Sequence, residues 1–106
     1  MKSFTIILAI AFVAGCATAL AAERSIMQKG KVFSEQQISI KKGDAVLFVN
    51  NDSVAHNVFS ISPGNEFNLG SQLPGVATPV TFNAVGDVVV TCAIHPRMKL
   101  TVKVTQ

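Results

Sequence analysis

The sequence predicts an all-β domain, an antiparallel β-sandwich that follows an export signal. Short stretches with alternating apolar and polar residues recur at close spacing along the chain, and valine is common in them. Turns built on Gly, Asn and Asp separate these stretches, and no stretch has the apolar period of a helix. Close spacing of short strands is typical of a β-sandwich, and 106 residues suffice for one domain.

The first segment, residues 1–21, has the layout of a secretory signal peptide. Lys2 is followed by an apolar run from Phe4 to Val13, and small residues end the segment with "ALA" at 19–21. The run is too short to predict a membrane-spanning helix. We therefore expect export to the periplasm and no transmembrane span.

Two ways of processing this signal stay open. Cleavage near Ala21 or Ala22 would release a soluble domain of residues 22–106. "VAGC" at 13–16 also matches a lipobox, in which Cys16 would be lipidated and would tether the domain to a membrane.

The first predicted strand carries Ile38 and Ile40, and a Lys-Gly-Asp turn at 42–44 follows it. The next strand, residues 45–49, is a continuous apolar run, which predicts burial on both faces. "NND" at 50–52 ends that strand, because Asn and Asp favour turns.

"VAHNVFSI" at 54–61 predicts a further strand. Alternation places Val54, His56 and Val58 on one face, and it places Ala55, Asn57 and Phe59 on the other.

Residues 62–79 form the longest predicted connection, which we expect Phe67, Leu69 and Leu73 to pin to the body of the domain. "VTFNAVGDVVVTC" at 80–92 predicts two strands around a Val-Gly-Asp turn. The last predicted strand has its apolar residues, Leu100, Val102 and Val104, alternating with polar ones.

Charge and cysteine content narrow the function classes. Removal of the signal takes away one lysine and no acid, so the net charge of +3 becomes +2, and the basic residues are scattered. This pattern predicts no nucleic-acid binding. Cys92 is then the one cysteine of an exported domain, where an unpaired thiol needs burial or a bound partner.

Residues 88–104, "VVVTCAIHPRMKLTVKV", place Cys92, His95 and Met98 at three-residue intervals between two strands. His56 is the only other histidine, and it lies near a predicted strand end. Alternation turns both sulfur residues toward the core. One thiolate, two imidazoles and a thioether form the ligand set of a blue copper site.

Other chemistry fits less well. Structural zinc usually takes four Cys or His ligands, and the domain has three such residues. A hydrolase built on Cys92 and His95 would need an orienting third group and a substrate cleft.

Residues 88–104 and "AHNV" at 55–58 resemble the small cupredoxins, the plastocyanin and amicyanin group of type 1 copper proteins. The Cys-x₂-His-x₂-Met spacing is similar to that of amicyanin. The resemblance extends over residues 43–104. It implies a Greek-key β-sandwich with one copper ion near one end, acting as a one-electron carrier and not as an enzyme.

The resemblance also implies roles for single residues. His56, Cys92 and His95 would be equatorial copper ligands and Met98 the axial one. Asn57 would tie the two ligand-bearing segments together by hydrogen bonds. These five positions make up the implied copper site.

The resemblance further implies that His95 passes electrons through an exposed patch. Ile94, Pro96 and Leu73 would form this patch, and Pro96 also supports the ligand that precedes it. Arg97 departs from the pattern, because amicyanin-like loops carry a bulky apolar residue there, and its charge favours a partner that is acidic at this point.

Three functional hypotheses remain. The first is an exported, monomeric blue copper protein that carries single electrons between redox protein partners, which dock around His95. The second is a periplasmic protein that binds Cu(I) and delivers the ion. The third is a cupredoxin-like interaction module that binds no metal, for which replacing His56 would not affect function.

Overall fold

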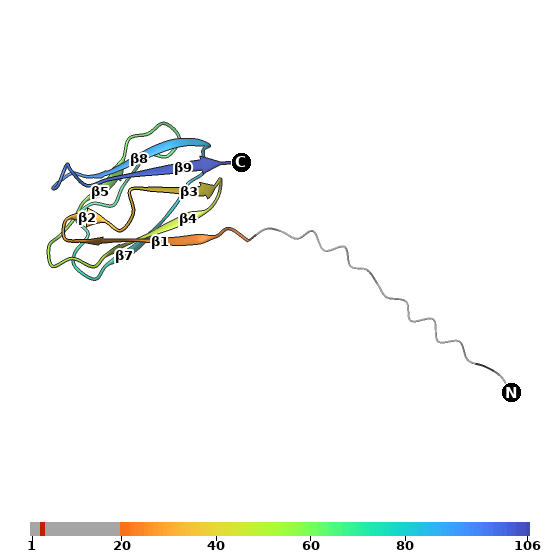
Figure 1. The fold of residues 1–106 in the computed structure, drawn as a ribbon, viewed down its shortest axis with the longest axis horizontal. Coiled ribbons are helices and arrows are strands. Elements are labelled where there is room, and N and C mark those ends of the chain that lie inside the picture. The colour runs from red at the N-terminus through yellow and green to blue at the C-terminus, as the bar shows by residue number, and fades with distance from the viewer. Residues whose placement is uncertain (1–2, 4–19) are drawn as a thin grey trace.

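The computed structural model describes residue 3 and residues 20–106. Nine strands form two sheets that face each other in this part of the chain (Figure 1). The strands are β1 (Glu23–Lys29), β2 (Val32–Phe33), β3 (Gln37–Lys41), β4 (Ala45–Asn50), β5 (Val58–Ser60), β6 (Phe67–Asn68), β7 (Ala77–Thr81), β8 (Gly86–Cys92) and β9 (Lys99–Thr105). The all-β sandwich is confirmed. Most of the predicted signal peptide, with Cys16, lies outside the described residues.

The sheets have the strand orders β2-β1-β4-β7 and β3-β9-β8-β5-β6. Two neighbouring pairs, β1–β4 and β3–β9, are parallel, so both sheets are mixed and are not antiparallel throughout. The turn around Gly43 carries the chain from one sheet to the other instead of closing a hairpin. Strand β3 therefore pairs in parallel with β9, and β4 lies between β1, which is parallel to it, and β7, which is antiparallel.

The core lies between the sheets and follows the predicted alternation. Strand β9 buries Leu100, Val102 and Val104, and β8 buries alternate residues that end at Cys92. Strand β4 departs from its prediction, because the outer face that carries Leu47 is only half-buried. The other sheet covers one face of β4 alone.

The structure corrects the predicted strand at 54–61. Strand β5 begins only at Val58, and His56 makes one isolated antiparallel bridge to Gln72. The side-chain alternation is nevertheless right, since His56 and Val58 are both fully buried.

The connection 62–79 contains β6 and the start of β7. Phe67 and Leu69 pack against the core as predicted. Leu73 is 59% exposed, so the expectation that it pins the connection is wrong. It follows Gln72, whose side chain is buried, and alternation therefore turns Leu73 outward.

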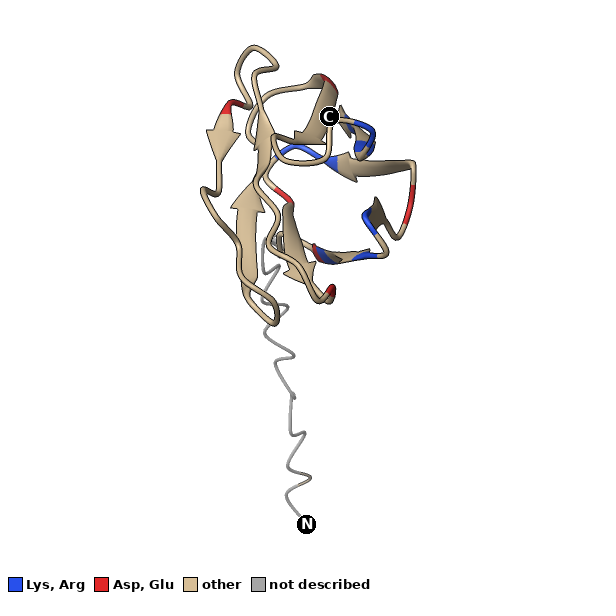
Figure 2. Cartoon of the chain, turned by 90° about the vertical axis from the view of Figure 1, so that its left-hand side faces the viewer, with Lys and Arg blue, Asp and Glu red and all other residues tan. Residues whose placement is uncertain are grey.

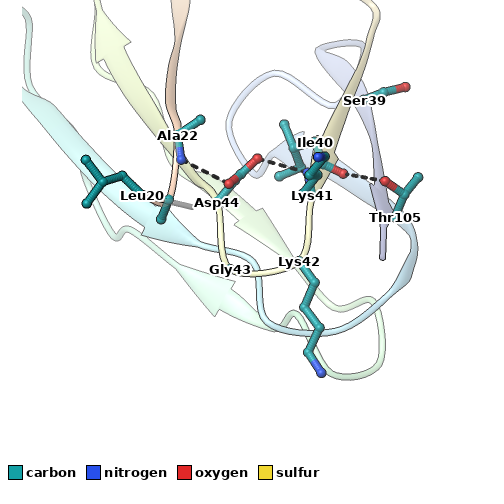
Figure 3. Close-up of a pocket in the computed structure, with 10 residues that line it drawn as sticks. Leu20, Ala22, Ser39, Ile40, Lys41, Lys42, Gly43, Asp44 and Thr105 are labelled. Atoms are coloured by element: carbon teal, nitrogen blue, oxygen red, sulfur yellow. Dashed lines mark hydrogen bonds between the residues drawn. The ribbon is translucent and has the colours of Figure 1, made fainter. Parts of the chain in front are cut away.

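Asp44 fastens one end of the sandwich (Figure 3). Its carboxylate accepts hydrogen bonds from the backbone N–H of Ala22, at 3.0 Å, and of Lys41, at 2.9 Å. This end holds the start of β1 and the end of β9, and the loop between β8 and β9 lies at the opposite end (Figure 1).

Candidate metal centre

The loop after β8 brings two of the predicted ligands together. Cys92 is the last residue of β8 and is 1% exposed, and its register partner on β5 is Val58. His95 lies three residues later and accepts a hydrogen bond through its carbonyl from the N–H of Met98, at 2.9 Å. The loop is thereby closed into a tight turn between two paired strands.

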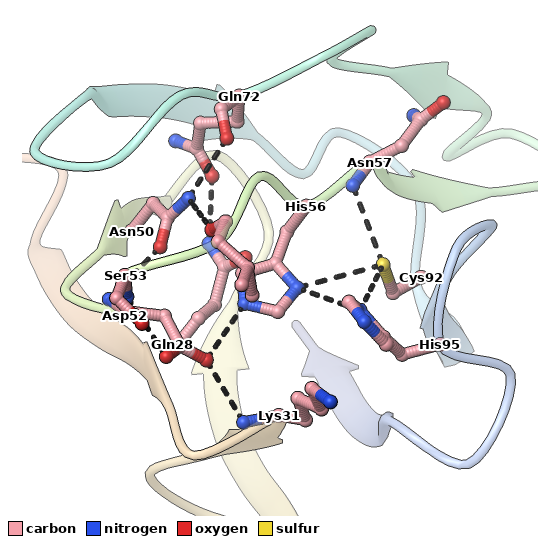
Figure 4. A network of polar contacts seen from close by, with 11 residues as sticks. Gln28, Lys31, Asn50, Asp52, Ser53, His56, Asn57, Gln72, Cys92 and His95 are labelled. Carbon is pink, nitrogen blue, oxygen red and sulfur yellow. Dashed lines mark hydrogen bonds and ion pairs between the residues drawn. The ribbon is translucent and has the colours of Figure 1, made fainter.

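His56 reaches the same place from the segment that follows β4 (Figure 4). Its backbone N–H donates to the carbonyl of Gln72 at 3.0 Å, and its carbonyl accepts from the Gln72 N–H at 2.7 Å. The side-chain amide of Asn50 donates to the carbonyls of Val54 and Gln72. This imidazole is thus fixed by buried hydrogen bonds although no regular strand carries it.

The three side chains converge on one point (Figure 4). The Nδ1 atoms of His56 and His95 are 3.1 Å apart, and the Sγ of Cys92 lies 3.8 Å from each of them. One ligand atom from each residue lies within 4.8 Å of the others. Two imidazole lone pairs and a thiolate repel one another at these distances unless a proton or a cation lies among them.

Asp52 is a site residue that the sequence analysis missed. Its Oδ2 atom lies 3.0 Å from His56 Nε2 and accepts the Lys31 N–H at 2.9 Å. The Lys31 N–H lowers the pKa of Asp52 to about 2, and the hydrogen bond to His56 acts in the same direction against the effect of burial. A charged carboxylate holds the proton on Nε2 and leaves Nδ1 free to bind a metal. The four-residue spacing from His56 was the available signal.

Asn57 ties the two ligand segments together through its backbone. Its N–H donates to Cys92 Sγ at 3.3 Å, and its carbonyl accepts from the N–H of Ala93 at 3.0 Å. Its side-chain amide instead donates to Asn68, at 2.7 Å. This N–H contact helps to fix the position of the Cys92 sulfur beside the two imidazoles.

Met98 lies just before β9 and is 1% exposed, on the face that also buries Leu100. The predicted surface patch lies on the outer side of the loop, where His95 is half-buried and Ile94 is 53% exposed. Pro96 and Arg97 are exposed beside them. Leu73 belongs to a different loop, and it does not line the hollow around His95.

Residues 20–105 match the model of the copper-binding family that includes plastocyanin and azurin. The chain belongs to this family. A curated relative, the methylamine utilization protein MauL of Methylorubrum extorquens, is 28% identical over 101 residues, which are 94% of this chain and 89% of that protein. Family membership and the His-Cys-His cluster together identify the cofactor as one type 1 copper ion.

Solved structures share the cupredoxin fold. A purple cupredoxin from Nitrosopumilus maritimus has a TM-score of 0.69 at 26% identity, and the match covers 77% of this chain and 99% of that one. A Cu(I) amicyanin variant has a TM-score of 0.69 at 22% identity, over 77% of this chain and 81% of that one.

A larger protein contains the same unit. The copper-containing nitrite reductase of Thermus scotoductus has a TM-score of 0.73 at 25% identity over 79% of this chain. The match spans 22% of the reductase, so the likeness concerns one part of that enzyme. Over residues 20–106 of the present chain, no helix has the length and hydropathy needed to cross a bilayer.

Proposed function

We propose that this protein is an exported carrier of single electrons and not an enzyme. His56, Cys92 and His95 would hold the copper ion through two imidazole nitrogens and a thiolate, and Met98 would add a weak thioether ligand. The observation that carries the proposal is the convergence of two imidazole nitrogens and one thiol within 4.8 Å, from segments 36 residues apart. Two His, one Cys and a weak Met make up a blue-copper ligand set.

Bound copper would supply one-electron chemistry by alternating between Cu(II) and Cu(I). The chain's own hydrogen bonds would hold the ligand atoms in place for both states. Asp52 orients His56 through Nε2, and the Asn57 N–H holds the sulfur of Cys92. Ligands that do not move when an electron arrives keep the barrier to transfer low.

We propose that electrons pass between the buried centre and a partner through the half-buried His95. His56 and Cys92 are 0% and 1% exposed, so His95 is the proposed ligand nearest to solvent. We propose that redox protein partners dock here against Ile94 and Pro96, that the protein acts as a monomer, and that it works in the periplasm. The relationship to MauL and to amicyanin supports a redox role.

A Cu(II) titration followed by visible spectroscopy tests the proposal. The wild-type domain should develop an intense blue band that saturates at one copper per chain. Cys92→Ser should lose the band, because it removes the thiolate–copper bond. Thr91→Ser is the matched control, since Thr91 precedes the ligand but lies outside the cluster, and it should stay blue. A colourless wild type would contradict the proposal.

Delivery of Cu(I) is the second candidate function, because one predicted ligand, His95, lies on a short loop that is partly open to solvent. A carrier should keep its copper for hours in the presence of a strong Cu(I) chelator, whereas a delivery protein should release it within minutes. His56→Ala tests the metal-free alternative, since the third hypothesis requires function to survive this substitution.

A further inference from the structure

The turn between β1 and β2 has an unexpected residue at its tip. Gly30 and Lys31 both have positive φ, at 63° and 58°, and they join the register pair Lys29 and Val32. Lys31 is the only residue other than glycine with positive φ among the described residues. Two-residue hairpin turns of this kind favour Asn or Gly at such positions, because a Cβ is strained there.

The backbone of Lys31 is held against the metal centre. Its N–H donates to Oδ2 of Asp52, the oxygen atom that also lies 3.0 Å from His56 Nε2. Backbone strain that the surroundings maintain next to a functional site suggests a role for the residue that carries it. Lys31 contributes only its backbone N–H to this hydrogen bond, which leaves its side-chain ammonium group available for another contact.

Lys31 lines a hollow of about 310 Å³ together with four residues of the copper loop, Ile94, His95, Pro96 and Arg97. The hollow therefore joins two apolar side chains and two cations around the half-buried His95. It combines the apolar contact that docking needs with a charge that can select a partner.

Neither cation has an ion-pair partner in the described part of the chain. Of the acids nearby, Glu35 pairs with Arg24 at 2.9 Å, and Asp52 accepts hydrogen bonds from His56 Nε2 and from the backbone of Lys31. Figure 2 looks onto this end of the sandwich, and the Lys and Arg positions lie toward the right-hand side of the view, with Asp and Glu positions among them.

We propose that Lys31 and Arg97 form a cationic rim that recognises carboxylates on an acidic redox protein docked over His95. The inference rests on the proposed function and specifies the chemistry of its partner. Ile94 and Pro96 provide the apolar contact, and the two cations select the partner's charge and set its orientation.

Oxidation of the Cu(I) protein by two reagents of opposite charge tests the rim. Hexacyanoferrate(III) takes one electron to become hexacyanoferrate(II), and tris(phenanthroline)cobalt(III) takes one to become the cobalt(II) complex. At low ionic strength, Lys31→Gln and Arg97→Gln should each slow the anionic reagent by about fivefold, and salt should remove most of this effect. The cationic reagent should react faster with both variants. Lys103→Gln, on the exposed face of β9, is the matched control and should change neither rate.

Lys31→Gly separates the side chain from the backbone. It should slow hexacyanoferrate(III) as much as Lys31→Gln does, but it should raise the thermal midpoint, because glycine accepts positive φ without strain. A lower midpoint for Lys31→Gly would contradict the strained conformation on which the inference rests.

NMR provides a measurement that does not depend on electron transfer. Titration of the Cu(I) protein with a hexaglutamate peptide should shift the amide signals of Lys31 and of the loop 94–97, and the double variant Lys31→Gln/Arg97→Gln should lose these shifts. If the wild type is blue but neither the oxidation rates nor the peptide-induced NMR shifts change in the variants, the inference is overturned while the proposed function stands. A wild type with no blue band would overturn the proposed function, and the inference with it.

Discussion

At the scale of single residues, one oxygen atom of Asp52 joins the metal centre to the neighbouring turn. Oδ2 lies 3.0 Å from His56 Nε2 and 2.9 Å from the Lys31 nitrogen. The carboxylate thus determines which nitrogen of His56 carries the proton, and it places a negative charge behind the imidazole that we propose as a copper ligand. Partners of this kind affect both the affinity and the electronic properties of a bound metal.

Replacing Asp52 by Asn should weaken copper binding and raise the reduction potential. The amide keeps the size of the side chain but removes its charge, so Cu(II) loses more stabilisation than Cu(I). We expect Cu(II) affinity to fall by about 10–100-fold, which a competition titration measures. Voltammetry checks the potential, and Asp87→Asn, on an exposed part of β8, is the control. An unchanged potential would show that Asp52 serves the fold alone.

The sequence predicted the residues of the cluster for a simple reason. Alternation along a strand fixes the face of every side chain, so Cys92 was predicted to point inward and His56 to share a face with Val58, and all three are buried. Asp52 was not found, because an Asx residue in "NND" equally fits a turn. Only the folded chain shows that its carboxylate faces His56 and not solvent.

At the scale of elements, Gln72 connects the segment that carries His56 to strand β4 of the four-stranded sheet. Its side-chain Nε2 donates to the carbonyl of Phe48 at 2.9 Å and lies 3.1 Å from that of Val76. Its Oε1 accepts from Gln28 Nε2 at 2.7 Å. Because this orientation is fixed by carbonyls, Gln28 must act as donor, and its own Oε1 is left buried without a partner in the described chain.

Substitution of Gln72 by Met should destabilise the fold by about 2–4 kcal/mol, because buried carbonyls and the Gln28 amide lose their partners. Urea unfolding of the copper-free protein measures this loss. Gln37→Met, at an exposed position of β3, is the matched control and should change stability by less than about 0.5 kcal/mol. The variant should also bind copper less tightly, because the backbone bridge to His56 loosens.

Two strands, β1 and β2, were not predicted from the sequence. Strand β1 buries Ile26 and Gln28 alone, and a buried amide breaks the apolar alternation by which strands are recognised. Strand β2 has two residues, which is too short for any pattern. The final strand was predicted well, because Leu100, Val102 and Val104 are all apolar and all buried.

At the scale of the whole molecule, the two ends of the sandwich have separate tasks. One end carries the cluster, and the other is fastened by Asp44, which binds the start of β1 and the turn after β3. The pairing of β1 with β4 and of β3 with β9 could not be predicted, because alternation fixes the face of a residue but neither the partner nor the direction of its strand.

Removing the Asp44 carboxylate should therefore affect stability without affecting the metal. Asp44→Ala loses two hydrogen bonds at a partly exposed site, and we expect it to lower the free energy of unfolding by about 1–2 kcal/mol. The blue band and the reduction potential should remain unchanged. Asp87→Ala, whose side chain makes no hydrogen bond in the described chain, is the control. A shifted potential would show that the two ends are coupled.

The separation of the two ends also determines which surface of the protein is exposed when its C-terminus is attached to a support. The chain enters β1 and leaves β9 at the same end, and the loop between β8 and β9, which contains His95, lies at the other (Figure 1). Strand β9 has seven residues, which span on the order of 23 Å at the usual rise per residue. A protein attached to an electrode through Gln106 would stand upright with the surface around His95 turned to the solution, where the proposed redox partners could reach it.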